Sequence, residues 1–113
     1  MHKSLVKLTA SEVVEGLKKG EISPLELITA AETRILETEP AINALPTLCF
    51  ERARACARSL MEKLKDGSEN SRGWLAGLPV AIKDLTDVAG VRTTYGSTIF
   101  KDHVPKASHP LVK

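Results

Sequence analysis

A single lysine, Lys83, follows a short apolar run at residues 78–82 and is itself followed by Asp84. An ammonium group among apolar side chains is costly unless a carboxylate pairs with it, or unless burial lowers the pKa so that the amine is neutral. A neutral lysine accepts protons, so this position is a candidate general base. A structural interpretation stays open, in which Lys83 pairs with Asp84 or another carboxylate, or extends into solvent.

The four residues Val80-Ala-Ile-Lys83 match the lysine motif on the third strand of protein kinases, where the lysine holds ATP phosphates. A kinase also needs a Gly-x-Gly-x-x-Gly loop on the preceding strand. Gly67, Gly73 and Gly77 do not have that spacing, and the segment before them is typical of a helix. The short match therefore does not support a kinase.

The segment after Lys83 is predicted to form turns. Asp84 is a residue type that caps turns and loops, and Gly96 can supply a positive φ at no steric cost. Together with Thr93, Thr94 and Ser97, Gly96 is expected to shape a turn.

The elements that must position this segment begin with a helix after Thr9. Thr9 and Glu12 have the spacing of a capping box, and Gly20 supplies a stop. One face of this helix is apolar and consists of Val13, Val14 and Leu17.

A second helix is predicted to begin at Ser23, which forms another capping box with Glu26 and precedes a proline at the first helical position. It should run to about Thr38, because Pro40 forbids much continuation. Its inward stripe is predicted to be Leu25, Ile28, Ala31 or Glu32, and Ile35.

A third helix is predicted over residues 51–65 and should end at Asp66-Gly67, before a polar loop at residues 68–73. Its inward face would hold Ala53, Cys56, Ala57, Leu60, Met61 and Leu64. Its arginines, Arg52, Arg54 and Arg58, are expected to form a solvated face.

Strands are predicted in the remainder of the chain. Residues 78–82 are short, apolar and rich in β-branched side chains, as in a buried strand. Residues 88–94 are a weaker candidate, and residues 45–49, which contain a proline, are at best an edge strand. Helices followed by strands indicate an α/β fold that begins with a helical lead-in.

Composition indicates an ordinary folded protein. Of the 113 residues, 42% are apolar and 27% are charged, which fits one domain. The net charge of +2 is too small to indicate a nucleic-acid partner. Apolar runs are too short to span a bilayer or to form the core of a signal peptide, so we expect no membrane partner and a cytoplasmic location.

The metal-binding and redox-active residue types are few. Cys49 and Cys56 match neither a zinc spacing nor a redox pair, and we expect free, buried thiols. The histidines His2, His103 and His109 are scattered and form no ligand set. No metal and no cofactor are expected.

A longer pattern of motifs surrounds Lys83. It consists of Gly77-Leu-Pro-Val-Ala-Ile-Lys83-Asp84, Asp87-Val-Ala-Gly90 and Thr93-Thr-Tyr-Gly-Ser97, preceded by Leu8-Thr-Ala-Ser-Glu12, Lys19-Gly-Glu-Ile-Ser-Pro-Leu-Glu-Leu27 and Ile42-Asn-Ala-Leu45. In order and spacing, the pattern resembles the N-terminal part of amidase signature enzymes over residues 5–112.

The resemblance implies an α/β fold, namely the N-terminal part of an α/β/α sandwich. Three lead-in helices would precede the first strands of a mixed sheet, which is incomplete in this chain. Residues 1–113 would then be an N-terminal portion of one amidase domain. Residues 1–67 would form the helical lead-in, and residues 74–113 the start of the catalytic core.

The resemblance also implies a mechanism in which Lys83 acts as a base through a bridging serine on a cis peptide. That serine relays the proton from a nucleophilic serine that attacks an amide carbonyl. The two serines of the family map to no residue here, and neither Ser97 nor Ser108 is assigned a catalytic role. His109 lies at or beside a position where the family usually has an aspartate. The chain by itself is therefore predicted to be inactive.

Three functions remain open. The first is part of an amidase that hydrolyses the C–N bond of a small carboxamide substrate. The second is part of the amidase component of a glutamine-dependent amidotransferase that acts on charged transfer RNA. The third is a non-catalytic module that associates with itself as a homo-oligomer through exposed apolar faces.

Overall fold

The computed structural model describes residues 4–65 and 72–113, which form two compact units. The helical unit comprises Met1–Ile42 and Phe50–Pro79, and the loop unit comprises Asn43–Cys49 and Val80–Lys113. The predicted helix stop at residues 66–67, nearly all of the predicted loop at 68–73, and His2 lie outside the described residues.

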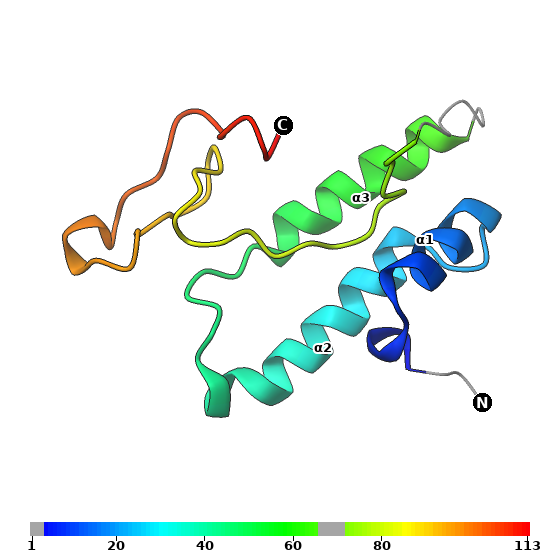
Figure 1. Cartoon of the computed structure of the whole chain (residues 1–113), viewed down its shortest axis with the longest axis horizontal. Coiled ribbons are helices and arrows are strands. Elements are labelled where there is room, and N and C mark those ends of the chain that lie inside the picture. The colour runs from blue at the N-terminus through cyan, green and yellow to red at the C-terminus, as the bar shows by residue number, and fades with distance from the viewer. Residues whose placement is uncertain (1–3, 66–71) are drawn as a thin grey trace. The chain divides into compact units, whose positions relative to one another are not determined.

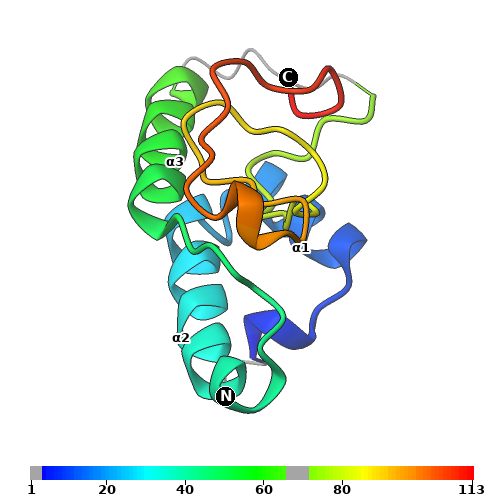
Figure 2. The same ribbon diagram turned by 90° about the vertical axis from the view of Figure 1, so that its left-hand side faces the viewer.

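The helical unit contains a 3₁₀ turn, η1 (Leu5–Lys7), and the helices α1 (Ala10–Lys19), α2 (Pro24–Ile42) and α3 (Phe50–Leu64). Figure 1 shows α2 and α3 as the long elements of this unit, and α2 packs against both α3 and η1. The loop unit contains one 3₁₀ turn, η2 (Thr98–Phe100), between irregular segments (Figure 2).

Helix α1 begins and ends as its sequence predicts. The Thr9 hydroxyl accepts a hydrogen bond from the Glu12 amide at 3.3 Å, and the Glu12 carboxylate accepts one from the Thr9 amide at 2.7 Å. Gly20 ends the helix in the left-handed conformation with φ at +73°. Val13 is buried, while Val14 and Leu17 are half-buried.

Helix α2 begins as predicted but continues further than predicted. The Ser23 amide donates to the Glu26 carboxylate at 2.8 Å, and the Ser23 hydroxyl accepts from the Glu26 amide at 3.2 Å. The predicted end near Thr38 is wrong, because the helix runs to Ile42 with Pro40 inside it. Pro40 has no amide to donate to the Leu36 carbonyl, so the helix lacks one hydrogen bond in its last turn but does not end there.

The core of the helical unit is small and consists of Val13, Leu27, Ile28, Ala57 and Ala76. The inward stripe of α2 is displaced from the predicted one, since Leu27 is buried while Leu25 is only half-buried. None of the helices in the described part of the chain is both long and apolar enough to cross a membrane.

Arg54 joins α3 to α2. Its guanidinium donates to the Glu32 carboxylate across the helix pair and to Glu51 of its own helix at 3.0 Å. The side chain of Arg54 is 21% exposed, so the prediction that it belongs to a solvated face is wrong. Arg52 and Arg58 are exposed, as predicted. Burial of Glu32 between the helices explains the difference, because its carboxylate requires a partner there.

The α/β fold predicted from the sequence is wrong: residues 4–65 and 72–113 contain helices and irregular segments but no β-strand. The predicted strands at residues 45–49, 78–82 and 88–94 are all irregular. Val80 and Ile82, expected to be buried, are 62% and 43% exposed.

The backbone hydrogen bonds explain the absence of strands from these residues. A strand requires a ladder of bonds to a neighbouring segment. Within residues 88–94, the Gly90 and Thr93 amides donate to the Pro105 and His103 carbonyls at 3.0 and 2.9 Å, but the Val91 amide between them closes a turn onto the Val88 carbonyl at 3.0 Å. The bonds to the neighbouring segment therefore do not form a continuous ladder. β-branched composition favours a strand only where such a partner segment exists.

Gly77 packs closely against two elements of the helical unit, and this contact generates a prediction. Its φ is +99°, and an added Cβ would lie 2.7 Å from Pro24 Cγ and 3.0 Å from Leu60 Cδ2. We expect Gly77→Ala to destabilise the helical unit by about 2–4 kcal/mol, combining left-handed strain with overpacking. Urea unfolding of the chain, followed by circular dichroism, measures this loss.

Gly20→Ala is the matched control, because Gly20 also has a positive φ but has nothing within 4 Å of an added Cβ. We expect it to cost only the strain, about 1–2 kcal/mol. Equal losses in the two variants would contradict the close contact at Gly77.

Candidate functional site

Lys83 lies in the loop unit on an irregular, exposed segment. Its carbonyl accepts a hydrogen bond from the Thr86 amide at 2.9 Å, while its ammonium makes no hydrogen bond or ion pair to any described residue. The expectation of a buried lysine at the end of a strand is therefore wrong in this structure. The side chain of Lys83 extends into solvent, as in one of the two structural alternatives given by the sequence. The catalytic assignment of Lys83 stays a prediction.

Asp84, the next residue, is joined to a segment ten positions further along the chain. Its carboxylate accepts hydrogen bonds from the Thr94 amide at 2.8 Å and from the Thr94 hydroxyl. Its own carbonyl accepts from the Tyr95 amide at 2.9 Å. The prediction that Asp84 caps a loop is confirmed, and its carboxylate is used for this purpose and not for pairing with Lys83.

The Asp84 carboxyl is stabilised in its charged form. The hydrogen bond from the Thr94 hydroxyl lowers the pKa of Asp84 most, followed by the bond from the Thr94 amide. Burial opposes this effect, while the positive charge of Arg92 adds to it. Donors aimed at a carboxylate favour the ionised state, so this loop is most stable when Asp84 is charged.

The segment that receives Asp84 is a tight turn. The Ser97 amide donates to the Thr94 carbonyl at 3.0 Å, and the two residues between them, Tyr95 and Gly96, have φ values of +53° and +71°. Positive φ at both central positions is typical of a type I′ turn. The predicted turn with a left-handed Gly96 is confirmed. The left-handed Tyr95 was not expected, and its contacts account for it.

The Tyr95 side chain lies in a cluster with Asp87, Phe100 and His103. Its hydroxyl donates to the Asp87 carboxylate and lies 3.4 Å from His103 Nε2. Its ring meets Phe100 edge to face with centroids 5.2 Å apart. The bond to Asp87 raises the pKa of Tyr95 above its ordinary value of 10.0. Sequence reasoning missed this cluster, because residues eight apart in irregular chain share no periodicity.

Arg92 joins three parts of the loop unit. Its guanidinium donates to the Lys101 carbonyl, to the Pro46 carbonyl at 3.3 Å and to the Thr47 hydroxyl at 3.2 Å. These contacts fix residues 43–49 to the rest of the unit.

The serines and His109 of this unit have structural partners. The Ser97 hydroxyl accepts from the Ile99 amide at 3.2 Å, and the Ser108 hydroxyl accepts from the Ala89 amide at 2.9 Å. His109 Nδ1 accepts from the Leu111 amide at 3.1 Å. An aspartate can accept the same kind of bond from the amide two residues later.

Metal-binding and redox groups do not gather here. Among the described residues, no group of three histidine, cysteine, aspartate or glutamate side chains could hold a metal ion. Cys49 and Cys56 are free, as predicted, but both are exposed and not buried.

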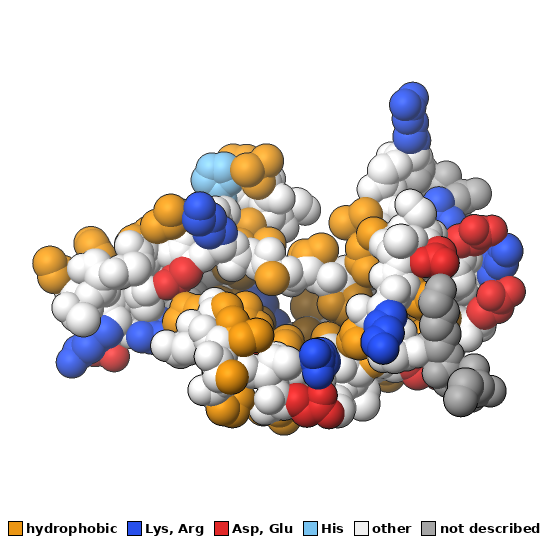
Figure 3. All heavy atoms as spheres, turned by 60° about the horizontal axis from the view of Figure 1, so that its bottom comes forward, with side chains coloured by type: hydrophobic (Ala, Val, Ile, Leu, Met, Phe, Trp, Pro, Cys, Tyr) orange, Lys and Arg blue, Asp and Glu red, His pale blue; other side chains and the backbone are white. Residues whose placement is uncertain are grey.

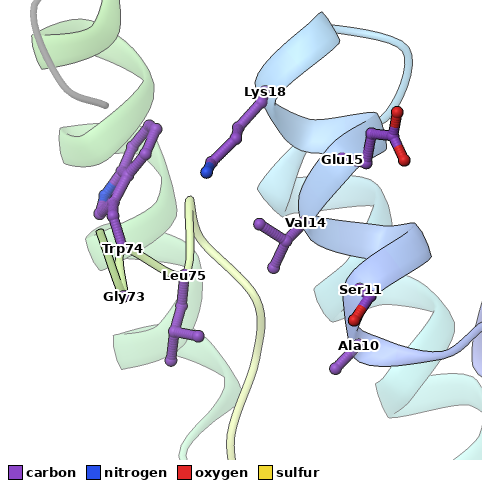
Figure 4. A pocket seen from close by; sticks show the side chains of 8 residues that line it. All are labelled: Ala10, Ser11, Val14, Glu15, Lys18, Gly73, Trp74 and Leu75. Atoms are coloured by element: carbon purple, nitrogen blue, oxygen red, sulfur yellow. The ribbon is translucent and has the colours of Figure 1, made fainter. Parts of the chain in front are cut away.

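The helical unit has an open hollow of about 440 Å³ between α1 and the segment at residues 73–75. Figure 4 shows Lys18 extending from α1 toward the segment that carries Trp74, with Val14 and Leu75 among the other lining side chains. Lys83 does not line this hollow, which is mostly apolar. A second hollow of about 400 Å³ in the same unit is lined by η1, α1, α2 and Leu78-Pro79.

This chain belongs to the amidase family, since the model of that family matches residues 26–113, most of the chain. The resemblance seen in the motifs around Lys83 is thereby confirmed.

Curated relatives support the same assignment. The chain is 42% identical over 101 residues to the A subunit of the glutamyl-tRNA(Gln) amidotransferase of Carboxydothermus hydrogenoformans, covering 89% of this chain and 20% of that protein. It is 38% identical over 94 residues to an amidase of Pseudomonas putida, covering 83% and 20% respectively. The chain thus spans about a fifth of the length of these relatives.

A solved structure is also similar. The chain superposes on it with a TM-score of 0.83 and 34% identity, covering 93% of this chain and 23% of that one. That structure is of a vestigial protein complex that reveals the evolutionary origins of an s-triazine catabolic enzyme. An inhibitor-bound form of the complex gives the same values.

The bonds to Asp84 predict a pH dependence of the loop. The pKa of Asp84 in the folded state lies below its usual value of 3.8, so the stabilisation is complete above that value and is lost as the pH falls through the folded-state pKa. We expect the Thr94 and Tyr95 amides to lose protection below about pH 4, measured by hydrogen exchange corrected for intrinsic rates.

Asp84→Asn is the control, because an amide side chain does not titrate. It should weaken the protection at neutral pH and abolish its dependence on acid. An unchanged acid dependence in Asp84→Asn would assign the effect to another carboxyl group.

Proposed function

We propose that this chain is the N-terminal portion of an amidase that hydrolyses a carboxamide C–N bond, with Lys83 as the base. Family membership supports the reaction class, and the position of Lys83 within the matched motifs supports its role. The observation that carries the proposal is the place of Lys83 within the family match over residues 26–113. In the structure its side chain is exposed and makes no hydrogen bond or ion pair with a described residue.

The chemistry follows from what a serine nucleophile lacks. A serine hydroxyl attacks an amide carbonyl effectively only if a base removes its proton. In the proposed mechanism a bridging serine passes that proton to the Lys83 amine, and the same proton then goes to the departing amine. Water releases the acyl group from the serine. The two serines and the oxyanion donors would belong to a longer protein, so the chain by itself would be inactive.

The predictions about substrate, nucleic acid and membrane belong to this proposal. A small carboxamide would be the substrate of the whole protein, with neither nucleic acid nor membrane required for hydrolysis. No cofactor enters the proposed steps, because a serine, a relay and a base suffice for acyl transfer.

A second candidate function is part of the amidase component of a transfer RNA amidotransferase. Identities of 42% and 43% to two such proteins, from Carboxydothermus hydrogenoformans and Natranaerobius thermophilus, favour it. Hydrolysis of glutamine with the same base would then supply ammonia to a companion protein. Co-purification of the whole protein with such a companion, and glutaminase activity that depends on it, would distinguish this function from free amide hydrolysis.

The isolated chain could also associate with itself. Several large apolar side chains are exposed in the loop unit, among them Ile99 at 85% and Leu111 at 87%. Figure 3 shows apolar side chains, in orange, on the surface of the molecule. Exposed apolar surface favours association. Self-association would be the function of this chain only if the chain is a non-catalytic module.

We expect Lys83→Ala in the whole amidase to lower kcat by about 10²–10⁴-fold while substrate binding changes little, because removing a general base affects the transition state. Steady-state kinetics on a simple carboxamide measures this. Lys106→Ala is the matched control, since Lys106 is an exposed lysine of the same unit. Near-normal turnover of Lys83→Ala would reduce Lys83 to a structural role.

A serine-directed fluorophosphonate should leave the isolated 113-residue chain unlabelled. The reason is that Ser97 and Ser108 accept hydrogen bonds from backbone amides in loops, and an amide cannot act as the base that a serine nucleophile needs. Mass spectrometry of the intact chain detects labelling. Stoichiometric modification would show an activated serine within these residues and overturn the proposed inactivity.

A further inference from the structure

The main chain around Lys83 is held from one side only. Among the described residues, no backbone hydrogen bond is made by residues 80–82, which precede it. Asp84, which follows it, is held through its carboxylate by Thr94 and through its carbonyl by the Tyr95 amide. The Lys83 carbonyl also accepts a hydrogen bond from the Thr86 amide at 2.9 Å. The direction in which the chain presents Lys83 therefore depends on this turn and on the bonds of Asp84 to Thr94 and Tyr95, which we call the Asp84–Thr94 clamp.

We propose that Asp84 and Thr94 are positioning residues for Lys83, an inference that rests on the proposed role of Lys83 as the base. The clamp fixes the peptide unit that follows Lys83 and so fixes the origin of its side chain. Neither Asp84 nor Thr94 takes part in the proton transfer itself.

Thr94 is suited to this role because it is buried and makes several hydrogen bonds. It is 7% exposed, and its carbonyl closes the Tyr95-Gly96 turn. Its hydroxyl also accepts a bond from the Gly96 amide at 3.3 Å, so the same oxygen serves the turn and the clamp. The Tyr95 hydroxyl donates a hydrogen bond to the Asp87 carboxylate and so attaches this turn to Asp87.

The clamp has an electrostatic consequence as well. A carboxylate adjacent to a lysine would ordinarily be available to pair with the ammonium and keep it protonated. Here the carboxylate oxygens of Asp84 are engaged by the amide and hydroxyl of Thr94. Lys83 is left without a carboxylate partner among the described residues.

A lysine base must place its amine within hydrogen-bond reach of the group it deprotonates. The side chain is long, so a small rotation of its main chain moves the amine considerably. A displacement of about 1 Å at a reacting group can lower the rate by about a hundredfold. Loss of the clamp should therefore lower turnover more than it lowers substrate affinity.

The test uses two adjacent buried threonines of the whole amidase. Thr94→Val removes the hydroxyl that binds Asp84. Thr93→Val is the matched control, because Thr93 is 2% exposed and its hydroxyl donates to the Val91 carbonyl at 3.1 Å, not to Asp84. We expect Thr94→Val to lower kcat by about 10- to 100-fold with little change in KM, and Thr93→Val to lower it by less than about threefold.

Thr94→Ser restores the hydroxyl and is expected to recover most of the turnover. If Thr93→Val lowers kcat as much as Thr94→Val, the effect is one of general loop stability and the proposal is overturned. It is equally overturned if Thr94→Ser fails to recover turnover although it folds.

Hydrogen exchange on the 113-residue chain supplies a second measurement that needs no activity. Thr94→Val should increase exchange of the Tyr95 amide at least about tenfold relative to Thr93→Val, because the clamp protects it. Equal exchange in the two variants would show that no clamp exists. If Thr94→Val does not fold, Asp84→Asn replaces it in both measurements, with Thr93→Val again as control.

The two proposals fail separately. Normal turnover of Lys83→Ala would overturn the proposed function, whatever the exchange of Tyr95 shows. Loss of turnover in Lys83→Ala together with normal kcat in Thr94→Val would retain Lys83 as the base and overturn its positioning by the clamp.

Discussion

The carboxylate of Asp84 and the amide and hydroxyl of Thr94 connect two parts of a segment that has almost no regular secondary structure. Backbone polar groups in such a segment cannot find partners in a helix or a ladder, so side chains and turns must supply them. Once Thr94 is held, the left-handed Tyr95 and Gly96 follow, and the Tyr95 ring is brought to Phe100 and His103.

The helical unit is organised by other means. Its buried side chains are few, the segment at Gly77 packs closely against α2 and α3, and an ion pair joins these two helices. The half-buried ion pair of Arg54 and Glu32 adds little net stability, because desolvation offsets much of the attraction between the charges. Apolar packing and the capping boxes supply the rest.

Amide hydrolysis by a serine nucleophile imposes two conflicting demands on a base. The amine must be placed accurately, yet it must be free of partners that would keep it protonated. At Lys83, the proposed base, the following residue is anchored and no described residue engages the ammonium. Membership of the amidase family gives this geometry a chemical context, and the chain spans about a fifth of the length of its curated relatives.

The sequence by itself determined the starts of α1 and α2, the end of α1, the left-handed Gly96 and the family. Capping boxes and turn glycines act over at most four residues, and motif order is a property of the sequence alone. Only the tertiary structure decided the absence of strands from the described residues, the burial of Arg54 and the pairing of Asp84 with Thr94. These depend on segments 10 to 22 residues apart, whose meeting is governed by the path of the whole chain and by which polar groups remain without partners along it.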